Sequence, residues 1–131
     1  MGLDMYLFRV RQETLQNPTY NLDDDGEQVM YWRKANAIHH WFTEGYPNDN
    51  LEHLECDIDK LQILKKQCQE DIENKDNKDY KPNLVTASGF FWGSMMYDEW
   101  YYQDLQETVD KITELEQEHE EGDEYFYYAW Y

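Results

Sequence analysis

Long apolar runs are absent from this sequence, and with them the usual features of a membrane or exported protein. No stretch approaches the roughly 20 apolar residues of a membrane-spanning helix. The first eleven residues, MGLDMYLFRVR, contain Asp4 and no uninterrupted apolar region, so they do not resemble a secretory signal peptide. Tyr6 stands where an N-myristoylation signal needs Ser or Thr. These absences predict a cytoplasmic protein without a membrane partner.

Cysteine is scarce. Cys56 and Cys68 are the only two, and they lie twelve residues apart without a neighbouring Cys/His pair, which is poor spacing for zinc. Because no export route is visible, we expect both to be reduced thiols. Free cysteine is among the most buried residue types, so we expect buried thiols rather than ligands or nucleophiles.

Basic residues are few, above all near the C-terminus. The chain has 11 Lys and Arg against 29 Asp and Glu, a formal net charge of −18. The last 46 residues hold twelve of the acids and one base, Lys111, so about −11 of the charge lies there. This distribution predicts repulsion from nucleic acid and anionic membranes, and attraction to basic protein surfaces.

Aromatic residues, by contrast, are plentiful, with five Trp, twelve Tyr and five Phe among 131 residues. Disordered chains normally contain few aromatics, so we expect a folded protein with a small, aromatic-rich core. The length fits one domain, residues 1–131.

The local patterns predict a strand at each end of the chain, over 3–11 and 125–131, since both segments are short and rich in β-forming residues. Residues 12–26 contain turn-forming residues and predict a loop. A helix is expected over 27–43. Four residues spaced by four, three and four lie on the face that it is expected to bury: Tyr31, Ala35, Ile38 and Phe42.

Further along, a short strand is expected over 51–56, and then a helix that starts near Asp59 with Gln62 in a capping-box arrangement. The buried stripe of that helix is expected to be Leu61, Leu64, Cys68 and Ile72. A final helix over 97–121, capped by Ser94 or Asp98, is expected to bury Tyr101, Leu105, Thr108, Ile112 and Leu115. The predicted fold class is α+β: a single compact domain in which three main helices pack on a small sheet that includes both terminal strands.

Three segments carry a family resemblance: MGLDMYL at 1–7, YWRKANAIHHWF at 31–42, and SGFFWGS at 88–94 followed by YDEWYYQDL at 97–105. Together with the aromatic C-terminal strand, they resemble a widespread family of small proteins encoded by bacteriophages and prophages. The family has no assigned biochemical activity. The resemblance therefore implies a setting, a phage protein made in the cytoplasm of a bacterial host cell, and no mechanism.

The acidic C-terminal region predicts a surface that binds a partner. Carboxylates three or four residues apart on a helix form a row of negative charge that a nucleic-acid-binding groove can accept. The leading hypothesis is a non-enzymatic protein that binds a basic host protein, such as a CRISPR nuclease or a restriction enzyme, and inhibits it by mimicking nucleic acid. A face that only maintains solubility fits the same composition. The expected partner-binding residues are Glu107, Asp110, Glu114, Glu118, Glu121, Asp123 and Glu124.

The alternative hypothesis is a pocket for a nucleotide-like ligand. Bases, histidines and rings concentrate in YWRKANAIHHWF, and cations beside aromatic faces can hold a phosphate and stack on a base. The expected lining comprises Trp32, Arg33, Lys34, His39 and Trp92, with Trp41, Phe90 and Phe91 as further stacking surfaces. The structural interpretation is that Arg33 pairs with acidic neighbours and that His39 and His40 rim the core.

Complete catalytic and metal motifs are missing. His40 and Glu44 are spaced to share a metal, but a site needs at least three ligands. The segment SGFFWGS is neither a nucleophile elbow nor a phosphate-binding loop. Asp23, Asp24 and Asp25 lack the alternation of a calcium loop. We therefore predict no metal, no cofactor and no enzymatic activity.

Overall fold

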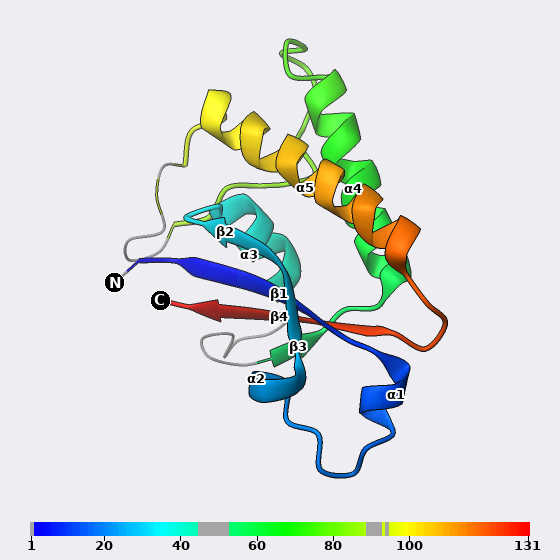
Figure 1. The fold of residues 1–131 in the computed structure, drawn as a ribbon. Coiled ribbons are helices and arrows are strands. Elements are labelled where there is room, and N and C mark those ends of the chain that lie inside the picture. Colours follow the sequence, from blue (N-terminus) through cyan, green and yellow to red (C-terminus); the bar gives the residue numbers. More distant parts are fainter. Residues whose placement is uncertain (1, 45–52, 89–92, 94) are drawn as a thin grey trace.

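The two ends of the chain form the centre of the sheet. The computed structural model describes residues 2–44, 53–88, 93 and 95–131. In these ranges, β1 (Asp4–Val10) pairs antiparallel with β4 (Glu124–Trp130), while β2 (Glu27–Arg33) and β3 (His53–Glu55) lie at the edges. The strand order is β2-β1-β4-β3 (Figure 1). The predicted α+β fold, with both terminal strands in one sheet, is confirmed.

One face of this sheet is covered by three helices, α3 (Asn36–Thr43), α4 (Ile58–Glu73) and α5 (Glu99–Glu118) (Figure 1). Two single-turn helices, α1 (Gln12–Leu15) and α2 (Leu22–Asp25), lie in the segment that was predicted to be a loop. Turn-forming residues follow each of them, Asn17 and Pro18 after α1 and Gly26 after α2, and keep each helix to four residues.

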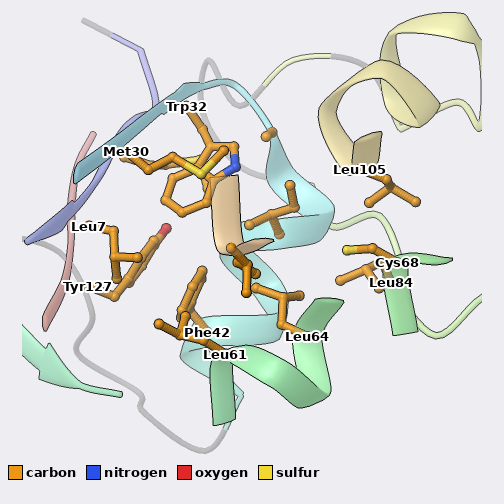
Figure 2. Close-up of a cluster of buried hydrophobic side chains, with 14 of the residues drawn as sticks. Leu7, Met30, Trp32, Phe42, Leu61, Leu64, Cys68, Leu84, Leu105 and Tyr127 are labelled. Carbon is orange, nitrogen blue, oxygen red and sulfur yellow. The ribbon is translucent and has the colours of Figure 1, made fainter. Parts of the chain in front are cut away.

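The core lies between the sheet and the three longer helices. Strand residues alternate, so that Tyr125 and Tyr127 of β4 point inward and are buried. The ring of Phe42 stacks on that of Tyr127 with centroids 4.1 Å apart and planes 7° apart (Figure 2). Most of the residues that were predicted to be buried are buried: Ala35, Ile38, Phe42, Leu61, Leu64, Cys68, Tyr101, Leu105, Thr108, Ile112 and Leu115. Ile72 of the predicted α4 stripe is half-buried.

The predicted helix over 27–43 is wrong in its first half. Residues 27–33 form β2, which pairs with β1, and the helix begins only at Asn36. A strand alternates faces where a helix would not, so Trp32 points inward and Tyr31 points outward. Tyr31, expected in the core, is 44% exposed, and its hydroxyl donates a hydrogen bond to Asp4 Oδ1 at 2.6 Å.

The starts of α4 and α5 are set by carboxylate caps. Asp57, rather than Asp59, caps α4 by accepting a hydrogen bond from the Lys60 N–H at 2.8 Å. Asp98 caps α5 as predicted, through the Tyr101 N–H at 3.1 Å. The third strand is shorter than expected and spans His53–Glu55. Its predicted first residues, 51 and 52, lie outside the described ranges, as does Ser94.

A buried carboxylate joins α4, α5 and the segment between them. Asp71 accepts hydrogen bonds from the Tyr80 hydroxyl at 2.6 Å and from the N–H groups of Asn83 and Leu84 at 2.9 Å each. The Tyr101 hydroxyl donates to the Leu84 carbonyl oxygen at 2.5 Å and shares this proton with Asp71 Oδ2 at 3.2 Å. Burial, and then the charge of Asp71, raises the pKa of Tyr101. These donors satisfy a charge that would otherwise be costly to bury.

Candidate functional site

A cavity of about 290 Å³ lies where the end of β2, the start of α3 and the first half of α5 meet. Arg33 and Lys34 line one wall, and Trp100, Tyr101 and Asp104 of α5 line the other. Thr86 and Gly93, which come before α5 in the chain, line the cavity as well. Three segments that are distant in the sequence therefore meet at this cavity.

The corner between β2 and α3 positions the two bases. Lys34 has a φ of 56°, the left-handed region that non-glycine residues rarely adopt. Its N–H donates to the Leu3 carbonyl at 2.8 Å, and its carbonyl accepts from the Asn36 N–H at 3.0 Å. A Cβ on Gly93 would lie only 3.0 Å from the Lys34 Cβ. The chain thus turns abruptly here, and the strained backbone is fixed from both sides.

Two carboxyl groups of α5 border the same cavity, and they differ in environment. Asp98 is committed to capping the helix. Asp104 is half-buried, and among the described residues no group donates a hydrogen bond to its side chain. Burial, followed by the charges of Glu107 and Asp98, raises the pKa of Asp104 to about 7. This carboxyl changes charge near neutral pH.

The structure separates the residues of the predicted ligand pocket. Trp32 is buried, and its Nε1–H donates to Thr108 Oγ1 at 2.8 Å. His39 is fully buried, and its Nδ1 lies 2.6 Å from the Tyr127 hydroxyl. Both belong to the core, which corrects the prediction that they contact a ligand and that His39 rims the core. Arg33 and Lys34 do line the cavity.

Of the remaining stacking residues of that prediction, only Trp41 is described by the structure, and it does not line this cavity. Trp41 is half-buried, and its Nε1–H donates to Gln67 Oε1 at 2.7 Å. Phe90, Phe91 and Trp92 lie outside the described residues. Sequence reasoning missed Trp100 and Asp104, although their spacing of four on one helix places them side by side.

A second feature is a groove between the edge strand β2 and the second half of α5. Gln28 and Val29 form its strand side. Five carboxylates, which we call the α5 acidic surface, are exposed along and just beyond the helix: Glu107, Asp110, Glu114, Glu118 and Glu121.

Part of this charge is already paired. Glu118 lies 3.4 Å from Nη1 of Arg9, a buried guanidinium that Glu27 also binds at 2.9 Å. Lys111 lies 2.8 Å from Glu114. Exposed pairs such as Lys111–Glu114 are weak because water and salt screen them.

Two residues expected on the acidic face are corrected by the structure. Asp123 is only 7% exposed, and it accepts a hydrogen bond from Arg11 Nη1 at 2.5 Å and one from the Glu120 N–H at 3.0 Å. It anchors the turn before β4. Glu124 is half-buried in β4 opposite Val10, and burial, followed by the charge of Glu55, raises its pKa. Neither side chain belongs to the open surface of α5.

The described residues form neither a metal site nor a reactive thiol. In the described part of the chain, no group of three His, Cys, Asp or Glu residues is arranged to hold a metal ion. Cys56 and Cys68 are free thiols and are buried, as predicted. Burial raises the pKa of the Cys56 thiol to about 12 and raises that of Cys68 as well, which makes both poor nucleophiles at neutral pH.

The fold and these sites define a two-layer α+β protein with an acidic helix over one side of its sheet. Among the described residues, no helix has both the length and the apolar character needed to cross a bilayer. Comparison of the chain with protein-family models, with curated proteins and with solved structures found no match. Function therefore has to be argued from the sites themselves.

Proposed function

We propose that this is a phage-encoded binding protein that inhibits a basic host protein through its α5 acidic surface. The supporting observation is a row of exposed carboxylates, Glu107, Asp110 and Glu114, continued by Glu118. Neighbours three or four apart on a helix lie roughly 5–6 Å from each other. Each strand of a DNA duplex presents one negative charge per about 3.4 Å of axis, so the row offers a basic groove a line of charge that is sparser than one DNA strand but of the same order.

The first two carboxylates of the row keep their charge. Glu107 and Asp110 accept hydrogen bonds from the amides of Gln103 and Gln106, at 3.2 and 2.9 Å, and form no ion pair among the described residues. Amides do not neutralise a carboxylate. A cationic partner can therefore gain the full electrostatic interaction at these two positions.

The proposed target is a factor that handles nucleic acid, such as a CRISPR nuclease or a restriction enzyme, in the bacterial cytoplasm. The phage setting follows from the family resemblance, and the two free thiols fit a reducing compartment. The protein acts in this proposal by occupying the nucleic-acid groove of its target, without chemistry of its own.

Capture from a bacterial lysate over a salt series tests the proposal. The bait variant Glu107→Lys, Asp110→Lys, Glu114→Lys reverses three charges of the surface. We expect the wild-type protein to retain a nucleic-acid-binding protein at low salt, to release it as salt rises, and to lose it in this variant.

The matched control reverses the same number of charges elsewhere, as Glu73→Lys, Asp76→Lys, Asp79→Lys. These three residues are exposed near the end of α4 and in the turn that follows it. The control should bind like the wild type. If both triple variants lose the partner equally, net charge rather than the α5 surface is responsible. If the wild type retains no nucleic-acid-binding protein at any salt concentration, the proposal is wrong.

A further inference from the structure

The cavity beside Arg33 is not used by the function proposed above. Arg33 and Lys34 are exposed at its wall. Neither forms an ion pair among the described residues, although the chain contains 29 Asp and Glu residues. The other two arginines, Arg9 and Arg11, both pair with carboxylates. Five lysines also lack an ion pair among the described residues, but none of them lines this cavity: Lys60, Lys66, Lys75, Lys78 and Lys81. Two adjacent cations that are left free at a cavity in so acidic a protein are suited to an anionic ligand.

The same cavity has an apolar side. Trp100 and Met96 both line it and are 71% and 69% exposed. A monomeric protein exposes large side chains of this kind singly, but here two of them adjoin a concave site. An exposed indole offers a flat face on which a heteroaromatic ring can stack.

We propose that this cavity binds a nucleoside monophosphate, with Arg33 and Lys34 at the phosphate and Trp100 stacked on the base. The side chain of Asp104, which has no hydrogen-bond donor of its own among the described residues, also lines the cavity. The volume of about 290 Å³ lies at the lower limit of small-molecule pockets, roughly 300–1,000 Å³, which favours a mononucleotide over a dinucleotide.

Asp104 makes the site sensitive to pH. Asp98 and Glu107 on its own helix, and Arg33 and Lys34 on the opposite wall, are the charged groups around it. With a pKa of about 7, its carboxyl is mostly neutral at pH 6 and can donate a hydrogen bond to the ligand. At pH 8 it is ionised and repels the phosphate, so this residue weakens binding as pH rises.

The proposal can be tested by NMR through the indole N–H signals. The chain has five Trp, and the signal missing from Trp100→Leu identifies Trp100. Titration with AMP, GMP, CMP and UMP should shift the Trp100 signal in a saturable way, while Trp41, bonded to Gln67 on α4, stays in place. Adenosine and inorganic phosphate, each lacking one half of the ligand, should bind at least tenfold more weakly.

Two variants test the assigned roles. Arg33→Met should weaken binding about tenfold, whereas Lys66→Met, which removes an exposed charge from α4, should leave it unchanged. Asp104→Asn should bind the mononucleotide at pH 6. Between pH 6 and 8 the affinity of the wild type should fall roughly tenfold more than the affinity of this variant. That comparison removes the titration of the phosphate itself, which affects both proteins alike.

A static Trp100 signal with all four mononucleotides at several millimolar would overturn the proposal, and so would equal affinities of Arg33→Met and Lys66→Met. Neither result bears on the α5 acidic surface, because the capture experiment changes none of these residues. The two proposals can therefore fail separately.

Discussion

The indole of Trp32 and the hydroxyl of Thr108 connect the edge strand β2 to α5. Trp32 Nε1 donates to Thr108 Oγ1 at 2.8 Å, and the same hydroxyl donates to the Asp104 carbonyl at 2.7 Å. One buried oxygen therefore fixes the distance between the strand that ends at Arg33 and the helix turn that bears Asp104. The two walls of the cavity depend on this bond for their spacing.

Replacing Thr108 with Val should cost about 1–3 kcal/mol of unfolding free energy, because the shape is kept while the Trp32 N–H loses its acceptor in the core. Urea unfolding gives the measurement. Thr113→Val is the control, since Thr113 Oγ1 donates only to the Val109 carbonyl of its own helix at 2.8 Å and should cost under about 0.5 kcal/mol. Equal losses for both variants would show that the Trp32 bond contributes little.

Truncation of Phe42 to Ala should destabilise the fold by about 3 kcal/mol or more, since the ring is buried and stacks on Tyr127. Leu105→Ala, in the fully buried stripe of α5, should have a similar effect. Trp100→Ala removes a larger but exposed side chain and should cost under about 1 kcal/mol. The same urea experiment compares them, and a Phe42→Ala protein as stable as Trp100→Ala would contradict the assigned core.

Asp71→Asn should lower the free energy of unfolding by about 3 kcal/mol. The two carboxylate oxygens of Asp71 accept hydrogen bonds from two backbone N–H groups, whereas an amide has one oxygen and would turn its NH₂ group toward one of these donors. At least one of the Asn83 and Leu84 N–H groups would lose its acceptor. Asp79→Asn, at an exposed position in the same connecting segment, is the control and should be nearly neutral. Thermal unfolding of the two variants tests this, and matching midpoints would rule out the buried network as a source of stability.

Asp104 should make stability depend on pH between about 4 and 7. Its folded pKa of about 7 exceeds the ordinary aspartate pKa of 3.8, so the folded state binds the proton more tightly. Its contribution to stability is therefore full below about pH 4 and is lost as pH rises through 7. The unfolding free energy of the wild type minus that of Asp104→Asn should fall across this range and then level off. Carbon-13 NMR of the Asp104 carboxyl gives an independent check, since a midpoint near pH 4 would contradict the assignment.

The sequence predicts α4 and α5 well because each has one continuous apolar stripe. Leu61, Leu64 and Cys68 repeat at helical spacing without a competing pattern, and all three are buried. The terminal strands are equally clear from their β-forming residues and alternation. Such local patterns suffice wherever one periodicity dominates.

The segment 27–43 shows where local pattern is insufficient. Tyr31, Ala35 and Ile38 have helical spacing, yet residues 27–33 gain more by pairing with β1 than a helix would gain by continuing. That gain depends on a partner strand some 20 residues away in the sequence, so a short stretch of sequence does not reveal it. The turn at Lys34 is equally hidden, because a left-handed residue that is not glycine leaves no pattern.

The sequence predicted some of the residues at the candidate sites, but it did not predict where their side chains lie. Arg33 and Lys34 reach a cavity as the alternative hypothesis required, but Trp32 and His39 face the core once β2 is a strand. Asp123 leaves the acidic face because Arg11, 112 positions away in the chain, binds it. Contacts of such long range arise only from the folded topology.

The central position of β1 and β4 has a consequence for synthesis. At about 5–20 residues added per second, β1 leaves the ribosome on the order of ten seconds before β4 exists. During that interval β2 can pair with one edge of β1, but the edge that pairs with β4 in the folded protein has no partner. The nascent chain therefore carries an open sheet edge until its last strand is made, a period in which chaperones have most to bind.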